Sequence, residues 1–155
     1  MKRKLFSFAI IASFFAVMLS SCSKPASKCT PDENSSVGGY KGQHTILGFY
    51  TFDDSLTITN PTASDRKITI KSEKLGTTLT GTYDEKDCSK VLLDSIFITS
   101  QTIKTVTLSN IRASGYGIIN GNTIRTVINI KSGSASLGTL VLPIGGESLT
   151  GTFTK

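Results

Sequence analysis

The fold is decided by one stretch of the chain, NGNTIRTVINIKS, which spans residues 120–132. After the Asn-Gly pair, Ile124, Ile128 and Ile130 fall on one face of an extended chain, and Arg125, Asn129 and Lys131 fall on the other. This alternation predicts a β-strand with one buried and one solvated face. Asn-Gly between two β-runs indicates a type I′ turn, because both central residues of that turn need positive φ. We therefore expect 111–119 and 122–132 to form a hairpin.

Similar short runs, rich in Thr, Ile, Val, Leu, Ser and Gly, fill the chain from Tyr40 onward. No stretch keeps apolar residues at helical spacing for three turns, so helices are not expected. The predicted class is all-β, an antiparallel meander of about eight to ten strands that forms a barrel or barrel-like sandwich. Strands are expected near 40–52, 56–59, 67–71, 75–83, 91–99, 105–110, 111–119, 122–132, 137–142 and 149–153.

The N-terminus carries a different signal. Lys2, Arg3 and Lys4 precede an apolar run from Leu5 to Leu19, which is the layout of a helical secretory signal peptide. The run is shorter than the about 20 residues that span a bilayer. We expect three parts: a signal peptide over 1–21, a flexible tether rich in Ser, Lys and Pro over 22–37, and a single β domain over 38–155.

Charge and cysteine content narrow the function classes. The full chain has a net charge of +6, which falls to +3 without 1–21, because three of its basic residues and none of its acidic residues lie there. Without a basic cluster interleaved with aromatics, a nucleic-acid partner is not expected. Cys29 and Cys88 are predicted to form a disulfide, as an isolated pair does in an oxidising compartment. The alternative, a metal site, needs more ligands than two thiols and the lone His44.

Candidate catalytic residues are not evident. The lone histidine, His44, lies in a strand-like run without a Gly-x-Ser-x-Gly elbow and is expected at the surface or the barrel mouth. Acidic residues fall where turns are expected, as at Asp53 and Asp54 and in Asp84–Asp87. The latter lacks the ligand spacing of a calcium loop. We therefore expect a protein that is not an enzyme and that has no cofactor or metal.

Aromatic residues give one indication of binding. Tyr40, Phe49, Tyr50 and Phe52 are concentrated near the first strand and could line an apolar pocket in an open barrel. Ordinary core packing is the alternative. The chain is thus expected either to hold a small apolar ligand in its interior, or to act as an interaction module with a filled core and exposed loops such as 143–147.

Two segments of the β domain resemble each other. Residues 68–83 and 128–153 share an Ile-x-Ile-Lys-Ser run, a Leu-Gly-Thr run and a Leu-Thr-Gly-Thr-aromatic run, in the same order but at wider spacing in the second segment. An internal duplication and a chance likeness in a Thr-rich and Gly-rich chain both account for this.

The residues Leu19-Ser20-Ser21-Cys22 resemble the lipobox of bacterial lipoproteins. This resemblance implies cleavage before Cys22 and acylation of its thiol, so that the membrane is a partner through a lipid anchor. The lipobox, the Gly38-Gly39-Tyr40 run and the glycine-rich segment 113–122 occur together in this chain. In this combination the chain resembles small Bacteroidota outer-membrane lipoproteins with lipocalin-like or calycin-like barrels. The sequence departs from lipocalins at Tyr40, where they carry tryptophan.

The resemblance implies two further properties. Secreted proteins of that phylum are O-glycosylated in Asp-Ser/Thr motifs followed by an aliphatic or small residue, which would mark Ser55 and Ser95. Its surface lipoproteins carry acidic residues just after the lipidated cysteine, whereas 23–28 has none. The implied location is the cell envelope, at the periplasmic face of the outer membrane, with a small apolar ligand or an envelope protein as partner.

Overall fold

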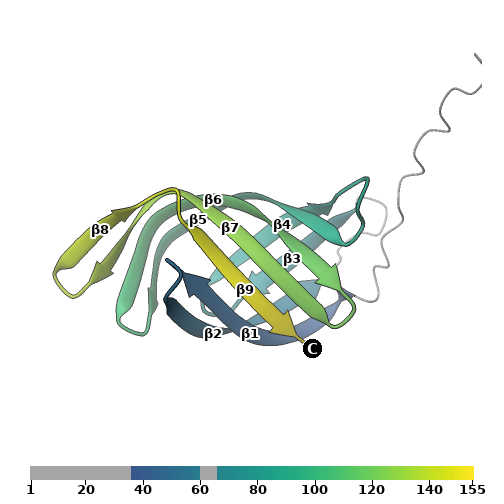
Figure 1. Cartoon of the computed structure of the whole chain (residues 1–155), viewed down its shortest axis with the longest axis horizontal. Coiled ribbons are helices and arrows are strands. Elements are labelled where there is room, and N and C mark those ends of the chain that lie inside the picture. The colour runs from purple at the N-terminus through teal and green to yellow at the C-terminus, as the bar shows by residue number, and fades with distance from the viewer. Residues whose placement is uncertain (1–35, 60–65) are drawn as a thin grey trace, which may run out of the picture.

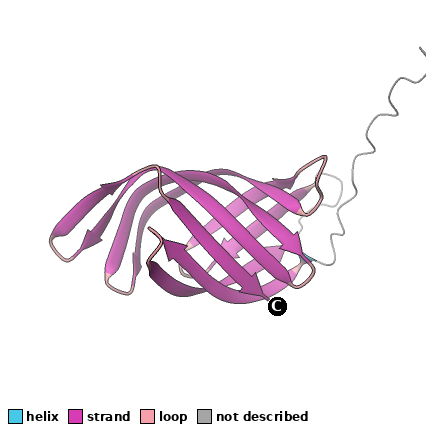
Figure 2. Ribbon diagram, viewed as in Figure 1, coloured by secondary structure: helices cyan, strands magenta, loops and turns pink. Residues whose placement is uncertain are grey.

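The computed structural model describes residues 36–59 and 66–155. Within these ranges the chain is built from β-strands (Figure 2), and no helix there is long and apolar enough to cross a membrane. The expected signal peptide, Cys22 and Cys29 lie outside the described residues. The strands are β1 (Gly38–Ile46), β2 (Tyr50–Thr59), β3 (Lys67–Ser72), β4 (Thr77–Tyr83), β5 (Lys90–Ile103), β6 (Val106–Asn120), β7 (Thr123–Leu137), β8 (Leu140–Ile144) and β9 (Ser148–Thr154).

The strands form one closed antiparallel barrel (Figure 1). Strands β1 to β6 pair in sequence order, β6 pairs with β7, and β9 lies between β7 and β1. The ring therefore contains every strand except β8, which pairs with the C-terminal part of β7. Ring closure satisfies the backbone groups of what would otherwise be edge strands. The prediction of an all-β antiparallel barrel is confirmed.

The barrel interior is filled by the apolar residues that alternate along the strands. Ile124, Ile128 and Ile130 are at most 3% exposed, as their spacing predicted. The inward positions of β1 and β2 follow the same period-two pattern. Alternation in the sequence thus identified the buried isoleucines of β7 correctly.

Strand β6 is longer than the sequence indicated. The segments 105–110 and 111–119, predicted as two strands, form a single strand with a register irregularity between Ser109 and Arg112. Asn110 has a φ of +53° at this point. Asn tolerates this left-handed conformation, so the chain bends at a bulge instead of ending the strand.

The predicted Asn-Gly turn is shifted by one residue. Asn120 is the last residue of β6 and faces Thr123, so Gly121 and Asn122 are the central residues of the turn. Only Gly121, at a φ of +56°, has a positive φ. This corresponds to glycine at the first central position of a type II′ turn, and the type I′ prediction was wrong.

The expected strand 137–142 is divided by a second turn of this kind. Leu137 ends β7 and faces Leu140, the first residue of β8, across Gly138 and Thr139. Gly138 has a φ of +58°. A glycine can adopt this conformation without strain, which permits the tight reversal inside an otherwise strand-like run.

The two similar segments differ in strand register. Ile68 faces Gly81 in the β3–β4 pair, whereas Ile128, its counterpart, faces Leu149 in the β7–β9 pair. Leu149 corresponds to Leu79 rather than to Gly81 in the sequence likeness. The likeness is therefore not accompanied by a common register.

Three strands of the ring, β5, β6 and β7, continue beyond one of its ends, where β8 joins them. Strand β4 contacts β5 only as far as Leu93, and β9 contacts β7 only as far as Asn129. The segments 98–111 and 132–144, which we call the extension, form a sheet of β5, β6, β7 and β8 that projects past the barrel (Figure 1).

Candidate functional site

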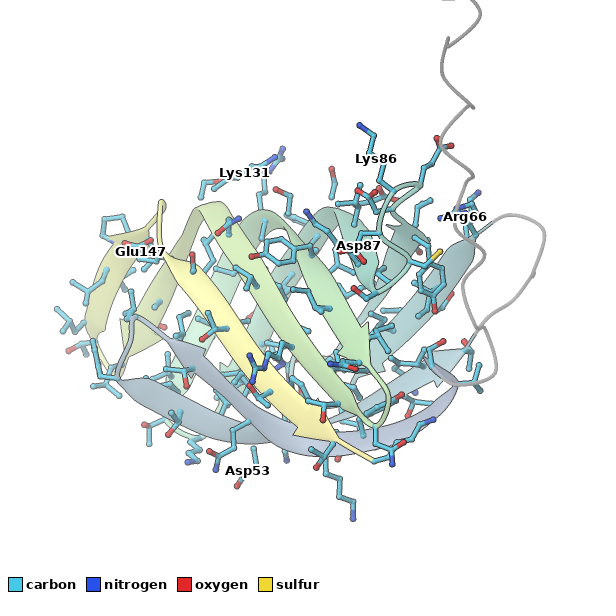
Figure 3. All side chains as sticks on the ribbon, turned by 45° about the vertical axis from the view of Figure 1, so that its right-hand side comes forward. Asp53, Arg66, Lys86, Asp87, Lys131 and Glu147 are labelled. Atoms are coloured by element: carbon cyan, nitrogen blue, oxygen red, sulfur yellow. The ribbon has the colours of Figure 1, made fainter. Side chains whose placement is uncertain are left out.

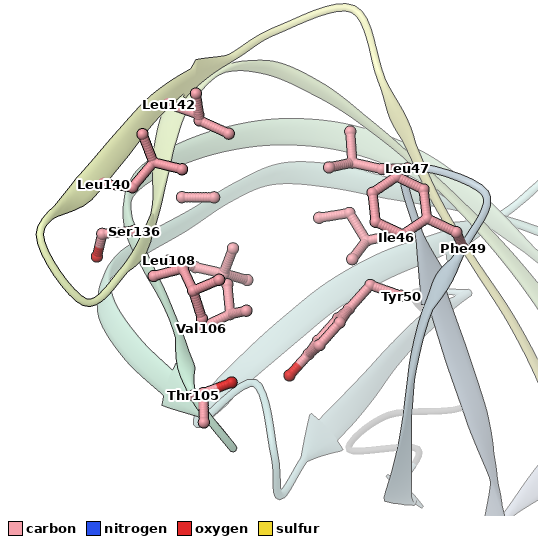
Figure 4. A pocket seen from close by; sticks show the side chains of 12 residues that line it. Ile46, Leu47, Phe49, Tyr50, Thr105, Val106, Leu108, Ser136, Leu140 and Leu142 are labelled. Atoms are coloured by element: carbon pink, nitrogen blue, oxygen red, sulfur yellow. The ribbon is translucent and has the colours of Figure 1, made fainter.

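An apolar groove of about 250 Å³ lies where the extension faces the β1–β2 turn (Figure 4). One wall comes from the end of β1, the turn and the start of β2, and the other comes from the extension. Its lining is almost entirely apolar: Ile46, Leu47, Phe49, Tyr50, Thr105, Val106, Leu108, Ala135, Ser136, Leu137, Leu140 and Leu142. An apolar concavity with few polar groups is the usual form of a site for small molecules.

Strand register builds the extension wall. Val106, Leu137 and Leu140 are cross-strand neighbours on β6, β7 and β8, and Leu108, Ala135 and Leu142 form the next such row. Residues two apart on a strand point to the same face, so both rows face the groove. Leu140 and Leu142 remain 54% and 50% exposed, and are available for contact with a ligand.

The opposite wall depends on the β1–β2 turn. Leu47 and Gly48 have φ values of +57° and +74°, and the tight turn leaves the Phe49 side chain 78% exposed. The Tyr50 hydroxyl donates a hydrogen bond to the Ile103 carbonyl oxygen at 2.9 Å, which links this wall to the extension. The groove is therefore held open between two connected elements.

The four aromatic residues predicted to line a ligand pocket are divided between two places. Phe49 and Tyr50 line the groove. Tyr40 and Phe52 are only 1% and 2% exposed inside the barrel, so their side chains offer almost no surface to a ligand. The sequence concentrated these residues in one region, but the strand alternation and the turn separate them.

A buried polar cluster lies in the barrel core near Phe52. His44 Nε2 is 3.1 Å from Asp54 Oδ2, and the Ser72 hydroxyl donates to the same oxygen at 2.5 Å. His44, Asp54 and Ser72 are between 1% and 4% exposed. The prediction of a surface or mouth histidine was wrong, because His44 occupies an inward position of β1 between the rings of Phe52 and Phe153.

Asp53 and Asp54 also lie within a strand and not in a turn. Both belong to β2, where Asp53 points away from the barrel (Figure 3) and Asp54 points inward. The second Asp54 oxygen, Oδ1, accepts hydrogen bonds from the backbone N–H groups of Ser55 and Lys74 at 2.7 and 2.8 Å. The carboxylate therefore attaches the β3–β4 turn to the core.

Electrostatics keeps Asp54 ionised. Burial alone would raise its pKa, but hydrogen bonds from His44, Ser72 and the Lys74 backbone, together with the electrostatic effect of the nearby His44 ring, outweigh burial and lower the pKa. An ionised carboxylate only accepts hydrogen bonds, so His44 Nε2 carries the hydrogen that it donates to Asp54.

This cluster has the residue types of a hydrolase triad but not its arrangement. Ser72 and His44 both bond to Asp54, so the histidine does not stand between the serine and the carboxylate as a general base must. Its side chains are also closed off from solvent. The cluster is best understood as a polar support within the barrel wall.

One side of this cluster contains two buried atoms without a hydrogen-bond partner. His44 Nδ1 and Thr126 Oγ1 are both in this state. His44 and Thr126 flank Gly151 on neighbouring strands, and a Cβ atom at Gly151 would lie 2.8 and 2.7 Å from these two atoms. Glycine at this position provides the space that the two polar side chains need.

The end of the barrel where β1 begins contains a group of buried hydroxyls that bond to one another. The Tyr40 hydroxyl donates to the Ser36 carbonyl oxygen at 3.0 Å, and the hydroxyls of Ser36 and Tyr83 are hydrogen-bonded at 2.7 Å. Burial raises the pKa of Tyr40. Buried polar groups that bond to one another therefore occupy this end, in contrast to the apolar groove at the other.

The acidic segment at Asp84–Asp87 forms the predicted solvated turn between β4 and β5. Asp84 Oδ1 accepts hydrogen bonds from the backbone N–H groups of Lys86 and Asp87, and these bonds lower the Asp84 pKa. Lys86 and Asp87 project from the surface (Figure 3). No group of three or more potential metal ligands occurs within 36–59 and 66–155.

The predicted modification sites occupy different environments. Ser55 is half-buried in the middle of β2, whereas Ser95 is exposed where the register of β5 shifts between Leu93 and Ile96. Cys88 lies in the β4–β5 turn, with its Sγ 3.9 Å from Arg66 Nη2. Cys22 and Cys29 fall outside the described residues, so lipidation and the Cys29–Cys88 disulfide stay predictions.

Sequence reasoning missed most of the groove. Leu108, Leu140 and Leu142 were expected as ordinary strand residues, and only the loop after them was named as an interaction element. One available signal was the segment from Ser132 to Gly146, which contains no charged residue. By itself such a run predicts buried strand residues, so the exposure of these leucines became evident only from the strand pairing.

Comparison of the chain with family models, curated proteins and solved structures found no match.

Proposed function

We propose that this chain is a non-enzymatic, lipid-anchored binding protein of the cell envelope that holds a small apolar ligand in the groove at the end of its barrel. One observation carries the binding proposal: two rows of apolar side chains on the extension face Phe49 and Leu47 across an open groove. Exposed apolar side chains concentrated in one concavity favour association with an apolar molecule.

The proposed ligand lies at the barrel end, because the interior is occupied. The inward residues of β1, β2 and β7 are buried core residues, among them Tyr40, Phe52 and Ile124. The polar side chains that line the groove are Thr105, Ser136 and Tyr50. The Tyr50 hydroxyl already donates a hydrogen bond to the Ile103 carbonyl oxygen. This composition favours hydrocarbon over a sugar or a charged molecule.

The proposed anchor and the groove are separated along β1. The groove begins at Ile46, and the start of β1 at Gly38 is about 26 Å away at the usual rise of a strand. The segment that would carry the lipid at Cys22 joins the domain at the Gly38 end, so the proposed attachment point and the groove lie at opposite ends of β1.

Binding is tested with the mature chain, residues 22–155, carrying Cys22→Ser to prevent acylation. All nine strands lie after residue 36, so this form retains the whole barrel. The probe is the neutral fluorophore N-phenylnaphthylamine, with the neutral alcohol 1-decanol as the competitor. We expect saturable fluorescence enhancement that 1-decanol reverses, and that Leu140→Ser weakens about tenfold, since removing a leucine side chain that the ligand would bury costs roughly 1.5–3 kcal/mol.

The matched control is Leu92→Ser on the outer face of β5. Leu92 is 43% exposed, close to the 54% of Leu140, but it does not line the groove. Equal loss of binding in both variants, or no saturable binding by the parent chain, would contradict the proposal.

Anchoring is tested separately with the full chain in Gram-negative cells supplied with an alkyne-labelled palmitate. The parent chain should take up the label and fractionate with the outer membrane, whereas Cys22→Ser should do neither. Cys88→Ser is the control and should be labelled normally. Label on the Cys22→Ser chain would show that the lipobox assignment is wrong.

The second candidate, an interaction module with a filled core, is favoured by one separate observation. Strand β8 pairs with β7 on one side alone, within the part of the chain that the structure describes. Its exposed edge is available to another polypeptide.

A further inference from the structure

Strand β8 is an apolar edge strand with both of its faces open. Leu140, Val141 and Leu142 are 54%, 61% and 50% exposed, although Leu140 and Leu142 point to the groove and Val141 points to the opposite side. No charged residue occurs from Ser132 to Gly146. Edge strands are normally protected by lysines, bulges or covering elements, and an unprotected apolar edge is a template for strand pairing.

The other edge of the extension, on β5, contacts the barrel at two points. The Tyr50 hydroxyl donates a hydrogen bond to the Ile103 carbonyl oxygen, and the Gln101 side chain lies beside Gly76 in the β3–β4 turn. The two edges of this small sheet thus differ, because the β5 edge contacts the barrel whereas the β8 edge has only Pro143 as a protective residue.

The turn between β7 and β8 shows which backbone groups face outward. A two-residue hairpin makes Leu137 and Leu140 a hydrogen-bonded pair, and such pairs alternate along an antiparallel ladder. Leu142 and Ile144 therefore bond to β7, while the backbone groups of Val141 and Pro143 point to the free edge. Since proline has no N–H, Val141 provides the sole outward donor within β8.

We propose that β8 pairs antiparallel with β8 of a second copy of this chain, with Val141 facing Val141 across a two-fold axis. In this register each Val141 donates its N–H to the other and accepts at its C=O, so the single donor of each edge is used. On either side of the axis, Pro143 falls opposite Thr139 of the turn, outside β8, so the Val141 pair supplies the backbone hydrogen bonds between the two copies. A symmetric dimer requires a self-complementary patch of this kind.

A second copy fits this edge better than an arbitrary foreign strand. In the two-fold register Val141 faces Val141, so both hydrogen bonds at the axis come from β8 itself, and two copies of this uncharged edge meet without like-charge repulsion. The pairing also brings together the apolar Leu140 and Leu142 side chains of both copies, which extends the two groove walls toward each other. The interface is small, so we expect a Kd in the micromolar range. It does not require a ligand in the groove.

Substitution of Val141 by residues of opposite charge tests the proposal. Val141→Lys and Val141→Glu alter an exposed side chain, so each variant should stay folded, as circular dichroism will check. In sedimentation velocity with the mature Cys22→Ser chain, the parent should self-associate as its concentration rises. Each variant alone should associate about tenfold more weakly or worse, because like charges face each other at the axis. An equimolar mixture of the two should recover association, because Lys faces Glu.

Val141→Thr serves as the matched control, because it keeps the N–H, the β-branched shape and a neutral side chain, and it should associate like the parent. A parent chain that stays monomeric up to submillimolar concentration overturns the proposal. So does a mixture of the charge variants that associates no better than either alone, which would show that Val141 does not face its own copy.

Discussion

The two ends of the barrel differ in the side chains that they carry and in how far these are exposed. At the end where β1 starts, the hydroxyls of Tyr40 and Tyr83 are buried and bonded to Ser36. At the other end, the sheet continues past the ring, and its apolar inner face lies open opposite Phe49. Buried polar groups bond to each other at one end, and apolar side chains are exposed at the other.

This difference indicates that one set of residues determines folding stability and another determines ligand binding. A buried hydroxyl or carboxylate needs a hydrogen-bond partner. Substitutions that remove a partner inside the ring therefore lower the free energy of unfolding. The extension has few buried polar groups that need a partner, and Leu140 and Leu142 are already half-exposed. We therefore expect substitutions inside the ring to affect unfolding, and substitutions in the groove to affect binding.

The largest expected effect comes from Asp54→Asn inside the ring. The amide cannot accept from His44, Ser72 and the two backbone N–H groups as the carboxylate does, and breaking such a buried charged network costs about 3 kcal/mol. Urea unfolding followed by circular dichroism measures this loss. Asp53→Asn, one residue away on the outer face, is the control and should change stability by less than about 0.5 kcal/mol.

Gly42→Ala should have the next largest effect. A Cβ atom at Gly42 would overlap the Thr152 carbonyl oxygen and the Phe153 Cα of β9, which are backbone atoms that cannot move alone. Such overpacking should destabilise by about 2 kcal/mol. A Cβ atom at Gly39, in the same strand, would meet nothing within 4 Å, so Gly39→Ala should leave the urea midpoint nearly unchanged or raise it. Equal effects of the two alanines would contradict the close β1–β9 contact.

Acid should weaken the ring through Asp54. Its pKa is lower in the folded chain than its unfolded value of about 3.9, so the unfolded chain binds the proton first as pH falls. The stability from this group is therefore full above that value and is lost as pH falls toward the folded pKa. Urea midpoints measured from neutral pH downward should decline below about pH 5, and less steeply in Asp54→Asn. The same slope in both chains would assign the acid sensitivity to other carboxylates, such as Asp84.

The smallest effect on folding should come from the groove. Leu140→Ser removes a side chain that is already 54% exposed, and we expect a change in unfolding free energy of less than about 0.5 kcal/mol. The same variant should lose binding of the fluorophore. A large drop in the urea midpoint would show that Leu140 supports the fold, and the separation between ring and extension would then fail.

Local patterns predicted the fold class well for a physical reason. Alternation at Ile124, Ile128 and Ile130 reports which face of a strand is buried, because the side-chain period of a strand is two wherever the strand lies. Turn positions were less exact. Asn110 and Gly138 each adopt positive φ, but one produces a bulge and the other a reversal, and the residue type alone does not distinguish these outcomes.

The candidate site was predicted only in part. Phe49 and Tyr50 were identified as possible lining residues, but Leu108, Leu140 and Leu142 were not. The burial of His44 was also missed, since its position depends on a carboxylate ten residues away on the next strand and on Phe153 near the C-terminus. Such contacts exist only once the strands have paired.

Neighbouring residues along the chain were sufficient to predict the all-β class, the inward isoleucines of β7 and the solvated turn at Asp84–Asp87. Strand pairing was needed to establish that the ring closes through β9, that β8 stays outside it, and that His44 and Asp54 meet in the core. Ring closure depends on which distant strands pair and in what register. That choice places a groove at one end of the barrel and leaves the edge of β8 open.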